Sequence, residues 1–139
     1  MIPEEVKKYV DSKFNALWDV LTNHRHLDYD QSRPLSSARI ALVDAATIGV
    51  NCKLGSHFYV TLTGNRTLGK PSNMRDGQRL IFEFIQDSTG SRTITLDSSF
   101  AAGPWTITLT TTASKKDILV CVYSAIDDKF YITNFQKGY

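Results

Sequence analysis

The stretch from residue 78 to residue 96, QRLIFEFIQDSTGSRTITL, decides the fold that we expect of this chain. In its two runs, 78–86 and 92–96, Ile, Phe, Leu and Thr alternate with polar residues, as in half-buried β-strands. Between the runs, residues 87–91, DSTGS, are of the types that favour turns. The stretch therefore predicts two strands joined by a hairpin turn.

The same pattern continues on both sides, and a second hairpin turn is predicted at residues 126–129, IDDK. About eight short strands without intervening helices are typical of an all-β domain. We expect a mainly β fold, an antiparallel β-sandwich that is jelly-roll-like, preceded by one N-terminal amphipathic α-helix. The predicted strands are Arg39–Val43, Thr47–Asn51, His57–Thr63, Gln78–Gln86, Arg92–Leu96, Trp105–Leu109, Asp117–Tyr123 and Phe130–Asn134.

The helix is predicted from Pro3 to about Asn23. Proline suits a first helical turn, and no later proline or glycine interrupts the segment. The apolar residues recur at steps of three and four, which places them on one face. Three partners for that face are open: the chain's own β domain, further copies in a helical bundle, or a membrane surface. The residues of this face are Val6, Val10, Phe14, Leu17 and Leu21.

Residues 24–37 are polar and contain Pro34, so we expect an extended linker there. The chain then divides into an N-terminal helix and linker, residues 1–37, and a β-sandwich head domain, residues 38–139. The formal charge of +2 is too small to indicate a nucleic-acid surface. No apolar run is long enough to span a bilayer, and the first residues resemble no export signal. We expect neither a nucleic-acid partner nor a membrane.

Residues that commonly build catalytic sites are scarce in this sequence. Cys52 and Cys121 lack the spacing of a zinc or thioredoxin motif, and we expect both to be reduced and inert. Residues 64–70 match the start of a phosphate-binding loop, but Pro71 replaces the Ser or Thr that would hold the metal ion. No nucleophile, base and acid form a recognisable motif. We expect a protein that is not an enzyme and that has no cofactor.

Several stretches of the β region resemble a β module of bacteriophage virion proteins: residues 61–73, 76–78, 84–96, 117–119 and 130–131. Upstream, His24 and His26, followed by Asp30, Ser32 and Pro34, are similar to a recurrent linker of phage fibres. That linker usually carries Asp-Gly after the histidines, where this chain has residues 27–30, LDYD. In the family the module occurs in tail fibres, head fibres and decoration proteins, usually as a trimer.

The resemblance implies a homotrimer in which the helix serves trimerisation and anchoring. In an extended linker, residues two apart point to the same side. His24 and His26 of three chains would then present six imidazoles around the trimer axis, a set suited to a first-row transition metal. The alternatives are solvated linker histidines or a contact with the C-terminal end of the helix. A structural metal ion on the axis is therefore expected only if the trimer forms.

The function that we expect is that of a non-enzymatic phage virion protein, a trimeric head fibre or capsid decoration protein on the particle surface. The length of the chain favours this role, because a fibre that reaches for a cell needs a long shaft. A tail-fibre or baseplate component is the alternative, and so is a head that recognises host surface glycans. Aromatic residues in sandwich strands more often belong to the core. The candidates for glycan contact are Trp105, Tyr123, Tyr131 and Tyr139.

We expect the partners of the chain to be further copies of itself and other virion proteins of the capsid or tail. The resemblance implies synthesis in the cytoplasm of a bacterial host and a final location in the virion.

Overall fold

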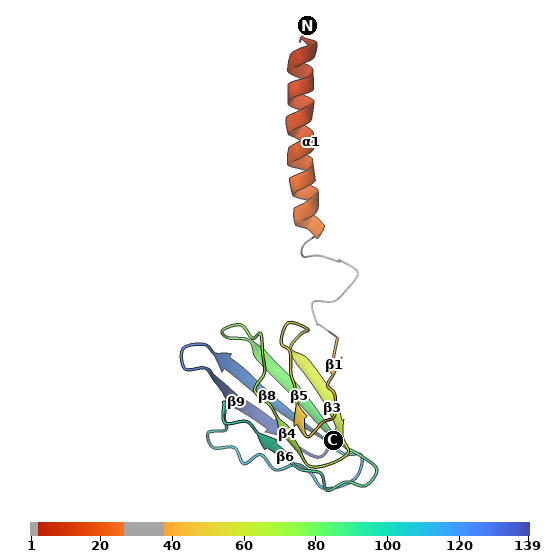
Figure 1. Cartoon of the computed structure of the whole chain (residues 1–139), viewed down its shortest axis with the longest axis vertical. Helices are drawn as coiled ribbons and strands as arrows, with labels where there is room; N and C mark the ends of the chain where they lie inside the picture. Colours follow the sequence, from red (N-terminus) through yellow and green to blue (C-terminus); the bar gives the residue numbers. More distant parts are fainter. Residues whose placement is uncertain (1–2, 27–37) are drawn as a thin grey trace. The chain divides into compact units, whose positions relative to one another are not determined.

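The computed structural model describes the backbone of residues 3–26 and 38–139, and the side chains of residues 3–15 and 38–139. The chain forms two units, Met1–Ser36 and Ser37–Tyr139. The first unit contains the helix α1, and the second contains all the strands (Figure 1). We refer to the second as the β unit.

Helix α1 runs from Glu4 to His26. It begins after Pro3, whose carbonyl oxygen accepts hydrogen bonds from the amides of Val6 and Lys7 at 3.1 and 3.2 Å. Val6 and Val10 are 47% and 55% exposed. The helix among the described residues is not long and apolar enough to cross a membrane.

The predicted helix is confirmed, but it ends later than expected, and this affects the histidine pair. His24 and His26 belong to the last turn of α1 and not to an extended linker. Positions two apart in a helix are about 200° apart around its axis, so the argument for a shared side does not apply to them. The side chains of both histidines, and those of Leu17 and Leu21, lie outside the described residues.

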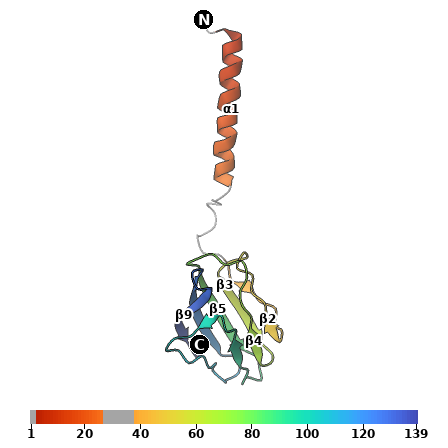
Figure 2. The ribbon, with the colours of Figure 1, turned by 60° about the vertical axis from the view of Figure 1, so that its left-hand side comes forward.

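The nine strands of the β unit form two sheets (Figures 1 and 2). The larger sheet has six strands, in the order β1 (Ile40–Ala41), β3 (His57–Leu62), β5 (Arg79–Gln86), β8 (Lys116–Ser124), β9 (Lys129–Gln136) and β7 (Phe100–Ala101). The smaller sheet has three, in the order β2 (Thr47–Ile48), β4 (Arg66–Leu68) and β6 (Ile94–Leu96).

The first six strands form a parallel coil. They alternate between the two sheets, so that the chain passes from the larger sheet to the smaller one and back in each turn. Within each sheet, successive turns pair in parallel: β1 with β3 and β3 with β5, and likewise β2 with β4 and β4 with β6. After this coil, β8 returns antiparallel along β5, and β9 pairs antiparallel with β8.

The mainly β class and the N-terminal helix are confirmed, but the strand directions differ from those of an antiparallel, jelly-roll-like sandwich. Among the described strands, antiparallel pairing is confined to β5–β8 and β8–β9. The alternation of apolar and polar residues determines which side chains face the core, and it is the same for both strand directions. The sequence pattern therefore predicts the strands without predicting their partners.

The hairpin predicted from residues 78–96 is wrong, because β5 and β6 lie in different sheets. The buried amide of Gln86 donates hydrogen bonds to the carbonyl oxygens of Arg92 (2.9 Å) and Thr110 (2.8 Å), and it accepts one from the amide of Arg92 (2.9 Å). These bonds fix the chain in a corner between the sheets. The second predicted turn, at residues 126–129, does connect a hairpin, β8–β9.

Two short strands, β4 and β7, were not predicted, and the strand predicted at Trp105–Leu109 does not form. Leu109 is buried and Ile107 packs against the core. The alternation in this segment therefore reflects burial of its apolar side chains, although the segment pairs with no strand. β4 lies in the stretch that resembles a phosphate-binding loop, and three residues give too little alternation to predict a strand.

A single hydrophobic core fills the space between the sheets. Phenylalanine rings dominate it: Phe82 stacks on Phe58 and Phe84, and it contacts Phe100 edge-on. Both cysteines belong to this core and are free thiols. Burial raises the pKa of Cys52 to about 11, and mainly burial raises that of Cys121 to about 12. Neither thiol is ionised near neutral pH, as expected for inert cysteines.

Candidate functional site

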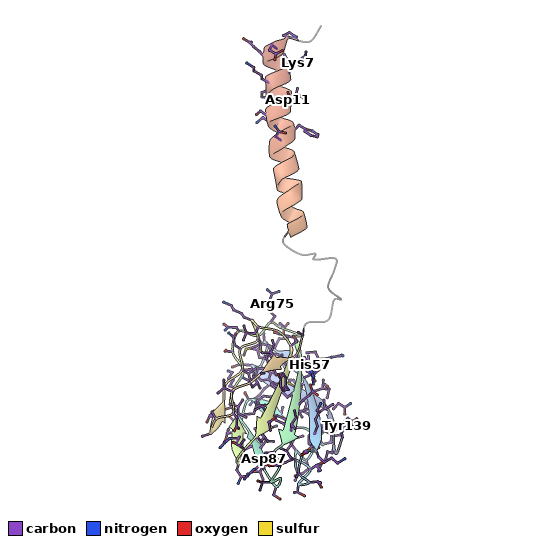
Figure 3. All side chains as sticks on the ribbon, turned by 90° about the vertical axis from the view of Figure 1, so that its right-hand side faces the viewer. Lys7, Asp11, His57, Arg75, Asp87 and Tyr139 are labelled. Atoms are coloured by element: carbon purple, nitrogen blue, oxygen red, sulfur yellow. The ribbon has the colours of Figure 1, made fainter. Side chains whose placement is uncertain are left out.

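The parallel register brings several loops together at one end of the β unit. Strands β1, β3 and β5 start at the same end, so residues 52–56 and 72–78, which precede β3 and β5, lie next to each other there. We call this the leading end, because residue 38 leads into β1 there. Figure 3 shows Arg75 and His57 towards this end and Asp87 and Tyr139 towards the opposite, trailing end.

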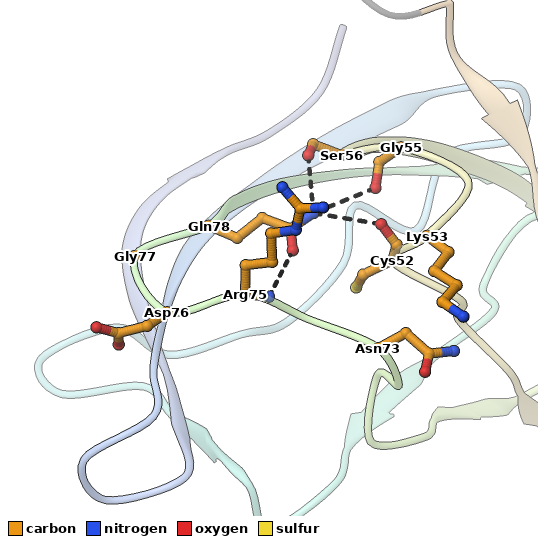
Figure 4. A pocket seen from close by; sticks show the side chains of 9 residues that line it. All are labelled: Cys52, Lys53, Gly55, Ser56, Asn73, Arg75, Asp76, Gly77 and Gln78. Atoms are coloured by element: carbon orange, nitrogen blue, oxygen red, sulfur yellow. Dashed lines mark hydrogen bonds between the residues drawn. The ribbon is translucent and has the colours of Figure 1, made fainter. Parts of the chain in front are cut away.

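A pocket of about 570 Å³ opens at the leading end. This volume lies within the range of small-molecule sites. Two loops, 52–56 and 73–78, supply its walls (Figure 4). The lining residues are Cys52, Lys53, Gly55, Ser56, Asn73, Arg75, Asp76, Gly77 and Gln78.

Gln78 connects the two loops beneath the pocket. Its Nε2 lies 3.0 Å from Ser56 Oγ, and it also approaches the carbonyl oxygens of Cys52 and Gly55 at 3.4 and 3.5 Å. Its Oε1 accepts a hydrogen bond from the amide of Arg75 at 3.0 Å. One side chain therefore holds both walls, which fixes the shape of the pocket before any ligand binds.

Asparagines fix the outer part of both loops. Asn51 Oδ1 accepts hydrogen bonds from the amide of Lys53 (3.1 Å) and from Asn73 Nδ2 (3.0 Å). Asn73 has a φ of 56°, a left-handed conformation that asparagine tolerates better than most residues. Asp76 and Gly77 form a turn, in which Gly77 has a φ of 76°.

The charges around the pocket are unbalanced. The side chains of Lys53 and Arg75 are exposed, and neither has a salt-bridge partner among the residues that the structure describes. The nearby carboxylate of Asp76 accepts a hydrogen bond from the amide of Ala125 at 2.8 Å, and Figure 4 shows it pointing away from Arg75. The pocket is therefore cationic.

A second polar cluster lies on the outer face of the larger sheet. Glu83, in β5, is only 5% exposed, and its carboxylate contacts three groups: Lys116 Nζ (2.7 Å), His57 Nε2 (2.9 Å) and Arg39 Nη1 (3.1 Å). Burial acts to raise the pKa of Glu83, but hydrogen bonds from Lys116 and Arg39 outweigh it and hold that pKa below its usual value. These contacts link β5, through Glu83, to β3, to β8 and to the segment before β1.

Aliphatic side chains lie near Glu83 on the outer side of β5 and β8. Alternation along β5 and β8 turns one set of side chains to the core and the other set to this outer face. The outward set contains five aliphatic residues, all half-buried, beside four polar or charged ones. We define the aliphatic face as Ile81, Ile85, Ile118, Val120 and Val122.

The aromatic residues predicted for glycan contact do not come together. Tyr123 is buried at 8% exposure, and its hydroxyl donates a hydrogen bond to Asp128 Oδ1 at 2.9 Å. The prediction of glycan contact is therefore wrong for Tyr123, because its inward position in β8 buries it. Trp105, Tyr131 and Tyr139 are exposed, but they belong to a loop, to β9 and to the C-terminal residues, and none of them lines the pocket.

The sequence did not predict the pocket. No spacing in the sequence relates Lys53 to Arg75. Their loops come together only because β3 and β5 pair in parallel. Among residues 3–15 and 38–139, no group of three or more His, Cys, Asp or Glu side chains could hold a metal ion. The prediction for His24 and His26 falls outside these residues and stays a prediction.

Comparison with known proteins supports the resemblance to phage fibres. No curated protein matches the chain. The model of one family, described as "Putative phage tail fibre C-terminal domain", matches residues 46–128. This range covers more than half of the chain and includes β2 to β8, the pocket and the hairpin turn. The chain therefore belongs to this family of phage tail fibre C-terminal domains.

Proposed function

We propose that this phage fibre protein, a structural component of the virion, works as a homotrimer whose three β units form the head of a fibre. The observation that carries this proposal is the aliphatic face of the larger sheet. A sheet that packs one face on its core normally carries polar side chains on the other face. Half-buried aliphatic side chains at outward positions of this kind are typical of a surface that another protein covers.

Further copies of the chain are the partner that best fits the aliphatic face. Pairing in the sheet sets Ile81 beside Val120, and the other aliphatic side chains of this face alternate across β5 and β8 with charged ones. The face of a neighbouring β unit can pack on such a surface, as sheets do in sandwiches. The resemblance to trimeric phage fibres supports three copies.

The helix offers a second surface for self-association. Val6 and Val10 lie one turn apart and are about half exposed. The predicted face continues with Phe14, Leu17 and Leu21, and in a three-helix bundle it would be removed from water. We propose that α1 serves trimerisation and anchoring, and that the β unit is the head domain.

The location that we propose is the tail, because the matching family is one of tail fibre domains. The expectation of a head fibre or capsid decoration protein, which rested on the length of the chain, stays a prediction. Immunogold labelling of intact virions with an antibody against the β unit distinguishes the two. Label at the tail supports the proposed location, and label over the capsid contradicts it.

Solution mass tests the trimer. Light scattering is expected to give a mass near three times 15.6 kDa for the full chain. A charge on the aliphatic face, Val120→Lys, should lower the mass to that of one or two chains. Thr95→Lys, at an exposed position of the smaller sheet, is the matched control and should stay trimeric. A monomeric wild-type chain, or a Val120→Lys variant that is folded and trimeric, contradicts this arrangement.

The axial metal ion is a separate proposal that requires the trimer. Because His24 and His26 lie about 200° apart around α1, only one of them in each chain can face the axis. Metal analysis of the purified trimer, compared with a His24→Ala/His26→Ala variant, tests it. A transition metal is expected in the first protein and is expected to be absent from the second. If the wild-type trimer contains no metal, the proposal is wrong.

A further inference from the structure

We infer that the pocket at the leading end binds a small hydroxylated anion, such as a sugar acid or a sugar phosphate, with Arg75 and Lys53 holding its charged group. The pocket is formed within one chain, so this inference goes beyond the proposed fibre role and does not depend on the number of copies. It is also distinct from the glycan contact predicted for the exposed aromatic residues.

The charge of the pocket lining favours an anionic ligand. Five of the nine other cationic side chains of the β unit have a carboxylate partner: Arg39 and Lys116 on Glu83, Arg66 on Asp44, Lys70 on Asp128, and Arg92 on Asp87. Lys53 and Arg75 have no such partner among the described residues, although they come from two different loops that line one pocket. Two unpaired cations at one concave site favour an anion, and the planar guanidinium suits a carboxylate or phosphate in particular.

The carboxylate of Asp76, the nearest to the two cations, does not neutralise them. Asp76 is the one acidic residue of the lining, and it would cancel part of the positive charge if it faced inwards. Its Oδ1 instead accepts the amide hydrogen of Ala125, in the β8–β9 turn, at 2.8 Å. Figure 4 shows its carboxylate on the far side of the loop from Lys53. The charge of the lining therefore remains available to a ligand.

Polar groups of the lining can bind hydroxyl groups. Ser56 Oγ lies 3.0 Å from Gln78 Nε2, which donates to it, so the serine hydroxyl can still donate its own hydrogen. Asn73 Nδ2 donates to Asn51 Oδ1, which leaves Asn73 Oδ1 able to accept. One donor and one acceptor beside two cations match a molecule that carries both an anionic group and hydroxyls.

A neutral sugar is not the preferred ligand. Neutral sugars are commonly held by stacking on an aromatic face, and no aromatic side chain is part of this lining. The charged group must then supply most of the affinity. Since Gln78 already fixes both loops, little ordering is lost on binding, and a small ligand can be held in spite of the open surface.

Titration of the full chain, followed by NMR or calorimetry, tests the inference with paired probes. D-galacturonate is compared with D-galactose, and glucose 6-phosphate with glucose. The acidic member of each pair should bind about tenfold more tightly or better, and added salt should weaken its binding. Which acid binds better distinguishes a carboxylate from a phosphate ligand. If neither acid binds, or if acid and neutral sugar bind alike, the inference is overturned.

Variants locate the site. Lys53→Gln/Arg75→Gln should weaken binding of the acidic sugar about tenfold or more. Lys115→Gln removes one positive charge at the trailing end, far from the pocket, and should leave binding unchanged. An unaltered unfolding midpoint shows that the double variant is folded, and unaltered binding by that variant overturns the assignment. If acetate, a monocarboxylate without hydroxyl groups, binds as well as galacturonate, the pocket selects its ligand by charge alone, and the part of the inference that concerns hydroxyls is wrong.

Solution mass, measured on the same samples, separates this inference from the proposed function. A trimer that binds no acidic sugar contradicts the inference alone, and a monomer that binds it contradicts the trimer alone.

Discussion

His57 Nε2 lies 2.9 Å from Glu83 Oε2 on the outer face of the larger sheet, so that β3 and β5 are joined by side chains as well as by their backbone ladder. A carboxylate only accepts hydrogen bonds, so the ring nitrogen carries the hydrogen in this contact. Lys116 and Arg39 complete the surroundings of the carboxylate. The cluster connects β8 and the segment before β1 to the centre of the sheet.

Removal of the negative charge of Glu83 should destabilise the β unit. Glu83→Gln keeps the shape of the side chain but leaves Lys116 and Arg39 facing a neutral amide. Because both cations are partly exposed and water screens them, we expect a loss of about 1–2 kcal/mol in the free energy of unfolding. Urea denaturation followed by circular dichroism measures it. Asp76→Asn, which alters an exposed carboxylate in a loop, is the comparison, and an equal effect of both changes would contradict a special role for Glu83.

The stability of the β unit should fall in acid. Hydrogen bonds from Arg66 hold the pKa of Asp44 well below its usual value, and those from Arg92 lower the pKa of Asp87. A carboxyl with a lowered pKa in the folded state contributes stability above its unfolded pKa of about 3.9, and this contribution is lost as the pH falls towards the folded pKa. The denaturation midpoint of the β unit should therefore decrease as the pH is lowered from about 6 to about 2. Asp44→Asn should reduce this dependence, and a wild-type midpoint that stays constant would rule the mechanism out.

The sequence predicted the strands much better than their arrangement. Alternation located β5 and β8 themselves, because burial acts on each strand separately. The parallel direction of β3 and β5 depends instead on the path of the chain through the smaller sheet between them. The pocket follows from this path, since Lys53 and Arg75 meet only when the loops before β3 and β5 stack. The alternation of residues within a strand contains no information about the contact between these two loops.

The corner between β5 and β6 should depend on Gln86. This side chain is 3% exposed, and it bonds to backbone groups of Arg92 and Thr110. Gln86→Leu fills a similar volume but leaves those groups without partners, each at a cost of about 1–3 kcal/mol. We expect the free energy of unfolding to fall by about 2–4 kcal/mol in chemical denaturation. Gln136→Leu, at an exposed position of β9, is the matched control and should change little. Similar losses in both variants would show that the corner does not need Gln86.

Two glycines with the same backbone conformation should respond differently to the same substitution. Gly90 and Gly77 both have a φ of 76°, so alanine costs each of them about 1 kcal/mol in conformational strain. A Cβ on Gly77 would meet nothing within 4 Å, whereas a Cβ on Gly90 would lie 2.5 Å from the carbonyl oxygen of Thr111 and 2.9 Å from the amide of Ala113. Backbone at that distance cannot yield without moving the loop that crosses the trailing end.

Gly90→Ala should therefore lower the free energy of unfolding by about 2 kcal/mol or more beyond Gly77→Ala, within the range of substitutions that strain the backbone of a packed loop. Urea denaturation of the two variants beside the wild type gives the difference directly, with the shared conformational cost cancelled. Equal losses would mean that the loop at residues 110–114 moves away from Gly90 at little cost. Gly90 belongs to the turn that follows β5, where its amide donates a hydrogen bond to Asp87 Oδ1 at 2.9 Å. Equal losses would therefore also argue against a rigid corner between β5 and β6.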